Sequence, residues 1–245
     1  MKALIGIGFG AFFVSSLAIG LRLVWLAHRN RELPELLIGL GILGIGPAGF
    51  AGTIFALLLG PWHPFASECL MAAATIAISG GALAAYVFNW TVFRRGDRWA
   101  QAIVGGSGLL FAVLFVGRLA THGFAPPLHV DAWLNVQSMA VTGCLLWGSG
   151  ESLRYYAIMR RRLRLELADP LVTNRFLLWG LGIGSAGVGS LISVTFTLIT
   201  GIPMQELGWL TLSNSLFGLA AAVLMWIAFL PPAAYRRWIH GLAAA

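Results

Sequence analysis

Residues Gly44–Gly49 (GIGPAG) lie in the second of several long apolar runs and return 138 residues later as Gly182–Gly187 (GIGSAG), with five of six residues unchanged. Within each copy, small residues are spaced four apart, which places them on one face of a helix. A face of small residues lets two helix backbones approach closely inside lipid. We therefore predict two equivalent packing surfaces in a duplicated membrane bundle. Their residues are Gly44, Ala48 and Gly52 in the first copy and Gly182, Ala186 and Ser190 in the second.

The composition indicates an all-α integral membrane protein. Apolar residues make up 58% of the chain, charged residues only 10%, and the mean hydropathy is +0.83. A soluble domain of this length would be roughly a quarter charged. The net charge of +7 comes from arginines in short segments between apolar runs. That pattern is typical of cytoplasmic loops, so we expect no nucleic-acid partner.

Seven runs are long enough to cross a bilayer, which takes about 20 helical residues. They cover residues 3–27, 36–60, 67–93, 99–121, 132–159, 171–200 and 207–231. Arginines follow runs 1, 3, 5 and 7, whereas the connections 61–66, 122–131 and 201–206 contain no Lys or Arg. This bias predicts an N-terminus outside and a C-terminus in the cytoplasm. We expect the membrane to be a bacterial inner (plasma) membrane.

Prolines and capping residues mark several helix starts. Pro34 and Pro170 stand where a first helical turn tolerates proline, and Asp169 and Ser67 are candidate N-caps. Pro47 lies in the middle of run 2, where it should kink the helix or leave a carbonyl free. We therefore take Pro47 as a candidate hinge.

The internal repeat extends beyond the opening stretch. Trp90 in run 3 matches Trp226 in run 7 at a spacing of 136, and the Leu21-Arg22 pair resembles a Leu-Arg pair 132 residues later. Runs 1–3 (about 3–93) thus match runs 5–7 (about 132–231), and run 4 (about 99–121) links them. Both triplets start on the same side, so we predict parallel repeats about an axis along the membrane normal, within one domain, 1–245.

This topology resembles the SWEET family of sugar transporters over the whole chain. The resemblance implies proline hinges and an Asn in each of helices 3 and 7; the matching positions are Pro47 and Asn214, and Ser185 occupies the repeat position of Pro47. The topology is also similar to that of microbial rhodopsins, whose retinal needs a lysine in helix 7. Lys2 is the only lysine, so we expect no retinal and no other cofactor. Segment 29–36 (RNRELPEL) resembles uncharacterised bacterial seven-helix proteins, which implies no activity.

Neutral polar side chains lie at one depth, in the outer halves of runs 5, 6 and 7. Such a band could line a cavity for a small solute, or it could supply interhelical hydrogen bonds worth ~0.6 kcal/mol each. The candidate ligand-binding residues are Gln137, Ser138, Thr195, Thr211, Ser213, Ser215 and, as the leading candidate, Asn214.

Ionisable residues within the runs are few. Arg118 and Arg22 lie near run ends and are expected to extend to the interface, although Arg118 could instead face a cavity and hold an anionic head group. Glu151 and Arg154 are three apart and should pair. The acidic and histidine residues of the outer loops lack a ligand spacing, so we expect no metal site. Those residues are His63, Glu68, His122, His129, Asp131 and Glu206.

No catalytic pattern is present in the sequence: there is no Ser-His-carboxylate arrangement, no phosphate loop after a strand and no HExxH. We therefore expect a protein that is not an enzyme. The leading hypothesis is a carrier that binds a small neutral or weakly polar solute, with membrane lipids as its other partners. The alternatives are a sensor that signals to a cytoplasmic partner, and a structural subunit of a homo-oligomer or larger membrane complex. Cys69 and Cys144 could be free or paired.

Overall fold

Every regular element is a helix in the computed structural model, which describes residues 2–125 and 131–243. This confirms the all-α class that the composition predicts. The elements are α1 (Lys2–Asn30), α2 (Leu33–Leu43), the π-helix η1 (Gly44–Phe50), α3 (Ala51–Leu59), α4 (Pro64–Phe93), α5 (Arg98–Thr121), α6 (Ala132–Leu163), α7 (Pro170–Thr200), the short 3₁₀-helix η2 (Met204–Glu206), α8 (Gly208–Phe229) and α9 (Ala233–Ala243).

Six helical units are long and apolar enough to cross a membrane: α1, the continuous unit Leu33–Leu59, α4, α5, α7 and α8. Helix α6 has 32 residues but is more polar, because its buried positions include Gln137, Thr142, Glu151 and Ser152. These side chains are covered by protein, since α6 packs against α4, α5 and α7. The low hydropathy of α6 is therefore partly due to polar side chains that face other helices of the bundle.

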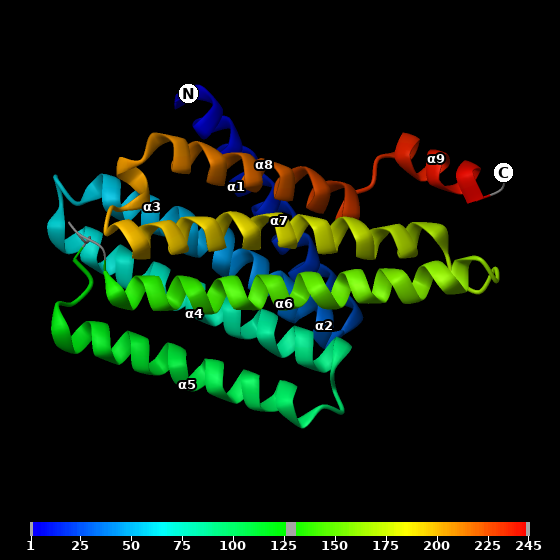
Figure 1. The fold of residues 1–245 in the computed structure, drawn as a ribbon, viewed down its shortest axis with the longest axis horizontal. Helices are drawn as coiled ribbons and strands as arrows, with labels where there is room; N and C mark the ends of the chain where they lie inside the picture. Colours follow the sequence, from blue (N-terminus) through cyan, green and yellow to red (C-terminus); the bar gives the residue numbers. More distant parts are fainter. Residues whose placement is uncertain (1, 126–130, 244–245) are drawn as a thin grey trace.

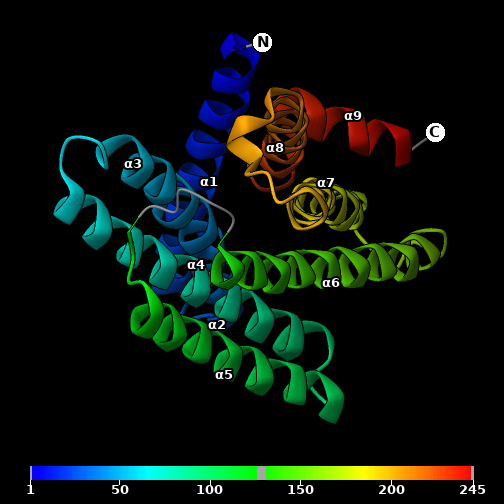
Figure 2. The same ribbon diagram turned by 60° about the vertical axis from the view of Figure 1, so that its left-hand side comes forward.

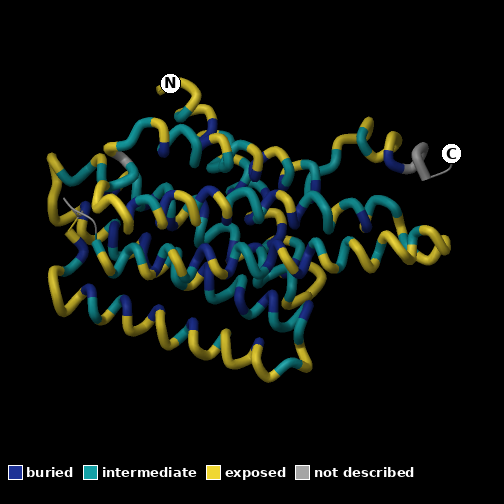
Figure 3. Tube along the Cα trace, in the orientation of Figure 1, coloured by how far each residue is buried: buried dark blue, intermediate teal, exposed yellow. Residues whose placement is uncertain are grey.

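The packing contacts close a ring of six helical units, which are α1, α2–η1–α3, α4, α6, α7 and α8. Helix α5 lies outside this ring (Figures 1 and 2). Helix α1 packs on α2, the unit α2–η1–α3 packs on α4, and α4 packs on α6. The ring continues through α7 and α8, and α8 packs back on α1. Helix α5 contacts α4 and α6, and its outward side is largely exposed (Figure 3). The centre of the ring is thus bordered by helices from both predicted repeats.

The arginine-rich connections lie at one end of the bundle, which we call the basic end. The connections after α4, α6 and α8 emerge there together (Figure 1), and the arginines that follow α8, Arg236 and Arg237, lie on α9. Helix α9, which follows α8, was not predicted; it packs on α7, where Asn174 hydrogen-bonds to Tyr235. At the same end, Arg22 donates a hydrogen bond of 3.0 Å to the carbonyl of Phe229.

The closest helix approach in the first half lies at Gly44 and Gly81. A Cβ added to Gly44 would lie 2.7 Å from the Cα of Gly81, and one added to Gly81 would lie 2.8 Å from the Cα of Gly44. The contact at Gly52 is looser: an added Cβ would lie 3.1 Å from the Cβ of Ala74 on α4. Small residues therefore let the second helical unit approach α4, as the spacing predicts.

The packing prediction for Ala48 is wrong, since this residue is exposed. The cause is the π-helix η1, which contains Pro47 and widens the turn from Gly44 to Phe50. Because a π-helix pairs residues five apart, a spacing of four no longer stays on one face. Gly49 takes the buried position instead.

In the second half, the predicted small residues pack against two neighbours. A Cβ added to Gly182 would lie 3.1 Å from the Cγ of Met225 on α8. The hydroxyl of Ser190 lies 2.6 Å from that of Thr142 on α6. Helix α7 is a regular α-helix through this region, which is why Ala186 stays on the inner face.

The predicted helix starts are confirmed at two places and wrong at one. Pro34 and Pro170 lie in the first turns of α2 and α7, and the Asp169 side chain accepts a hydrogen bond of 2.9 Å from the amide of Val172. Ser67 is not an N-cap, because α4 already begins at Pro64. Its hydroxyl instead donates to a carbonyl of α3.

Arg118 does not extend to the interface as predicted. It is 1% exposed, and its Nε lies 3.3 Å from Oδ2 of Asp131. The Asp131 carboxylate also caps α6 by accepting from the amides of Trp133 and Leu134. Arg118 thus pairs with a buried carboxylate from a different element, and that pairing replaces contact with water.

Glu151 forms the predicted pair with Arg154, at 3.6 Å, and a shorter one with Arg94, whose Nε lies 2.7 Å from Oε1. Arg94 also contacts Asp97. The hydrogen bond to Glu151 raises the pKa of the Arg94 guanidinium, with a smaller opposing effect of burial. This ion-pair group joins α6 to the α4–α5 connection at the basic end.

Candidate functional site

A cavity lies at the centre of the helix ring. Its volume is about 110 Å³, somewhat below the roughly 150 Å³ of an apolar cavity that binds benzene. All six ring units line it. Representative lining residues are Phe12, Ser16 and Ile19 of α1, Ile42 and Ile45 of α2–η1, Phe88 and Asn89 of α4, Cys144 and Gly148 of α6, Trp179 and Ile183 of α7, and Ala222 and Met225 of α8.

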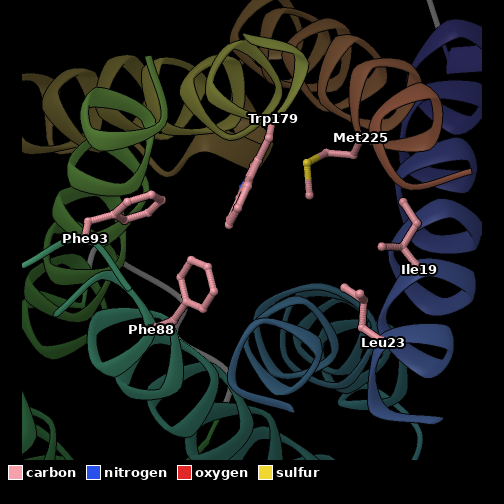
Figure 4. Close-up of a cluster of buried hydrophobic side chains, with 6 residues drawn as sticks. All are labelled: Ile19, Leu23, Phe88, Phe93, Trp179 and Met225. Atoms are coloured by element: carbon pink, nitrogen blue, oxygen red, sulfur yellow. The ribbon is translucent and has the colours of Figure 1, made fainter. Parts of the chain in front are cut away.

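Aromatic side chains border the cavity on the side of the basic end. The buried residues Phe88, Phe93 and Trp179 form one cluster with Ile19, Leu23 and Met225, and Figure 4 shows these six side chains between the surrounding helices. The ring centroids of Phe88 and Trp179 are 5.1 Å apart. Three partly buried aromatic residues pack against the cluster. They are Tyr155, Phe176 and Phe229.

The cavity lining is apolar, with few polar groups and no charged side chain. Asn89 is 3% exposed, and its Nδ2 donates a long hydrogen bond of 3.4 Å to the Cys144 carbonyl. The hydroxyl of Ser16 donates to the Phe12 carbonyl at 2.6 Å. The indole N–H of Trp179 has no hydrogen-bond acceptor among the residues that the structure describes. A site of this kind suits a neutral, mainly apolar molecule, because a charged one would be desolvated without a partner.

Matching positions of the predicted repeats line this cavity. The repeat spacings of 132, 138 and 136 relate first, second and third helices of the two halves. In every pair below, both residues line the cavity. The pairs are Phe12 with Cys144, Ser16 with Gly148, Gly41 with Trp179, Ile45 with Ile183, Ala85 with Ala221, and Asn89 with Met225.

Two of the predicted ligand-binding residues make interhelical hydrogen bonds. Gln137 is 4% exposed, and its Nε2 donates to the Thr75 carbonyl at 3.1 Å and to the Ser79 hydroxyl at 2.9 Å. The Ser215 hydroxyl donates to the Ile5 carbonyl at 3.0 Å. These contacts correspond to the second reading of the polar band, in which it holds helices together.

The other predicted residues do not come together at the cavity. Thr195 is exposed, the Thr211 hydroxyl donates to the Met204 carbonyl, and the Ser138 carbonyl accepts from Thr142. Ser213 and Asn214 are half-buried. None of the seven candidates lines the central cavity, and their role in binding stays a prediction.

Sequence reasoning passed over the residues that do line the cavity. Trp179 and Phe88 look like ordinary apolar positions of a membrane helix, and Asn89 lies towards the inner end of its run. The usable signal was the repeat itself, since its spacings relate lining positions of one half to lining positions of the other.

The loops that were considered for a metal show no group of three ligand side chains among the described residues. His129 of that set lies outside the described residues. Cys69 and Cys144 are both free, the first exposed and the second buried.

Comparison of the chain with protein-family models, with curated proteins and with solved structures gives no match. The resemblances to sugar transporters and rhodopsins therefore have no support from these comparisons. The function has to be argued from the cavity and from the helices around it.

Proposed function

We propose that this chain crosses a membrane seven times, with α6 as the additional span. Its 32 residues exceed the about 20 that a bilayer requires. Its polar side chains face α4, α5 and α7, and polar groups within a membrane are tolerated where protein covers them. We further place the basic end in the cytoplasm, because the arginine-bearing connections gather there.

We also propose that the ring consists of two parallel three-helix halves around a common axis. The order of neighbours supports this: α1–α2–α4 in one half corresponds to α6–α7–α8 in the other. The two junctions, α4 with α6 and α8 with α1, also correspond. A twofold axis along the bundle would exchange the halves and pass through the cavity.

The function that this arrangement supports best is binding of a small neutral, mainly apolar solute, and its passage between the two halves. The observation behind this proposal is the apolar cavity lined by all six ring units. Sites between symmetry-related halves are where secondary transporters bind substrate. Pro47 within the π-helix η1 offers a position where the second helical unit can bend, since the proline removes a backbone hydrogen bond.

Ligand binding tests the proposal through a cavity-filling substitution. Ala222 is buried and lines the cavity, whereas the adjacent Val223 is 50% exposed. We expect Ala222→Phe to abolish binding of neutral fluorinated solutes that the unaltered protein binds in lipid nanodiscs, measured by ¹⁹F NMR. Val223→Phe adds bulk one position away on the outer face and should leave binding unchanged.

A solute that passes this test is then assayed for exchange across proteoliposomes. Accelerated exchange that Ala222→Phe removes is the expected result. Binding without exchange would favour a sensor over a carrier. If no solute in a broad neutral panel binds the unaltered protein more strongly than Ala222→Phe, the proposed function is wrong.

A further inference from the structure

Resting on the proposed function, we infer the chemical class of the ligand: a flat, neutral, mainly apolar molecule with an oxygen that accepts a hydrogen bond from the indole N–H of Trp179. A ketone on a fused ring system is the simplest example. The inference depends on three observations, which concern the unpartnered N–H, the aromatic surfaces beside it and the small number of other polar groups.

The first observation is an unsatisfied donor on a residue of the cavity wall. Trp179 is 7% exposed, and its Nε1 is shielded from water and finds no acceptor among the described residues. Two aromatic donors elsewhere are satisfied: the Tyr86 hydroxyl donates to the Ala140 carbonyl at 2.7 Å, and the Trp133 indole donates to the Thr121 hydroxyl at 3.1 Å. A buried donor without a partner destabilises the fold, and a ligand oxygen would satisfy it.

An unpartnered indole is not sufficient by itself, because Nε1 of Trp147 is also buried without an acceptor. The difference is location. Trp147 packs between Tyr86 and Trp99, away from the cavity lining. Trp179 lines the cavity, and its indole extends from α7 between Phe88 and Met225 (Figure 4). Of these two rings, only that of Trp179 borders the cavity.

The second observation is the shape of the surface around Trp179. The Phe88 ring lies 5.1 Å from the Trp179 ring, and the thioether of Met225 lies across the space from both. Aromatic faces and a thioether favour flat, polarisable ligands. Branched aliphatic side chains from α1, including Ile19, complete the surface.

The third observation limits how polar the ligand can be. Besides Trp179, the polar side chains of the lining are those of Ser15, Ser16, Asn89 and Cys144. The Ser16 hydroxyl is already committed to the carbonyls of its own helix. A sugar, with several hydroxyl groups to satisfy, would leave most of them unpaired at a cost for each. One acceptor oxygen is enough to satisfy the buried Trp179 donor.

The experiment compares two probes that differ by one oxygen: 5-fluoro-1-indanone and 5-fluoroindane. Their dissociation constants are measured by ¹⁹F NMR in nanodiscs, after subtraction of partitioning into empty nanodiscs. We expect the unaltered protein to bind the ketone about tenfold more tightly than the hydrocarbon, the effect of one additional buried hydrogen bond. Trp179→Phe should reduce that ratio to about one, because it removes the donor and keeps an aromatic ring.

Trp147→Phe is the matched control. It removes an equally unpartnered indole N–H outside the cavity, and the tenfold ratio should remain. A ratio near one in the unaltered protein would overturn the inference while leaving solute binding intact. A large ratio that survives Trp179→Phe would overturn the role of Trp179. If neither probe binds above the empty-nanodisc level, the proposed function and the inference both fail.

Discussion

Gly81→Ala, compared with Gly80→Ala, tests whether close backbone contact holds the first half together. The two glycines are adjacent on α4, but Gly81 is buried against Gly44 and Gly80 is exposed. A Cβ on Gly81 would lie 2.8 Å from the Cα of Gly44 and 2.8 Å from the amide nitrogen of Ile45, whereas one on Gly80 would meet nothing within 4 Å. The atoms in the way are backbone, so no side chain can rotate to make room.

The expected magnitude follows from the difference between the two variants. Each gains the same helix propensity, about 0.5–1 kcal/mol, when Gly becomes Ala. That gain cancels in the comparison and leaves the cost of overpacking, about 1–3 kcal/mol. Gly80→Ala should therefore be as stable as the unaltered protein or more so, and Gly81→Ala should be less stable than Gly80→Ala by about 1–3 kcal/mol.

The assay is unfolding by SDS titration in mixed micelles, followed by circular dichroism, with free energies of unfolding from the two-state transition. Gly44→Ala approaches the same contact from the other helix, since its Cβ would lie 2.6 Å from the Ala77 carbonyl oxygen, and should match Gly81→Ala. Equal stability of Gly80→Ala and Gly81→Ala would refute the reasoning that these helices pack backbone to backbone.

Three further perturbations test other contacts. Arg118→Met should lower the free energy of unfolding by about 3–5 kcal/mol, because it leaves the Asp131 carboxylate buried without its partner; the double variant with Asp131→Asn should recover part of that loss in the same SDS titration. Gln137→Leu removes two hydrogen bonds between α6 and α4 and should cost ~0.6–1.7 kcal/mol; no change in its midpoint would show that these bonds do not stabilise the bundle. In detergent, a maleimide should label exposed Cys69 but not Cys144, which is 2% exposed. Mass spectrometry of the labelled peptides measures this, and label on Cys144 but not on Cys69 would contradict the prediction.

Helix positions could be predicted closely from the sequence because a bilayer sets the length of an apolar run. Run 4 was placed at 99–121, and α5 spans Arg98–Thr121. The largest difference lies at the end of run 5, where α6 continues four residues further, to Leu163. Its last turns are rich in arginine, and hydropathy does not distinguish a polar helix extending beyond the apolar layer from a loop.

The position of Ala48 could not be predicted, because the argument assumed a constant α-helical period. A single π-helical segment changes which residues face inward. Proline signals that a helix is disturbed, but sequence does not say whether the result is a kink, a free carbonyl or a π-helix. The repeat partner of Pro47 is Ser185, and α7 continues there without interruption.

The sequence also did not predict which side chains contact one another in the folded chain. Hydropathy places Arg118 near a helix end but does not show that Asp131, on the far side of a connection, turns back to meet it. The cavity was missed for a related reason: polar residues attract attention as ligand contacts, whereas this site is built mainly from apolar side chains such as Phe88 and Met225. An apolar site has the same composition as the core around it.

The central claim is that open apolar space exists between six helices, and xenon tests it most directly. Xenon enters dry apolar cavities, so a crystal of the protein pressurised with xenon should show an anomalous peak between Phe88, Trp179 and Met225. Ala222→Phe should remove that peak and leave other xenon positions unchanged. Xenon found only on the outer, lipid-facing surfaces would contradict the account.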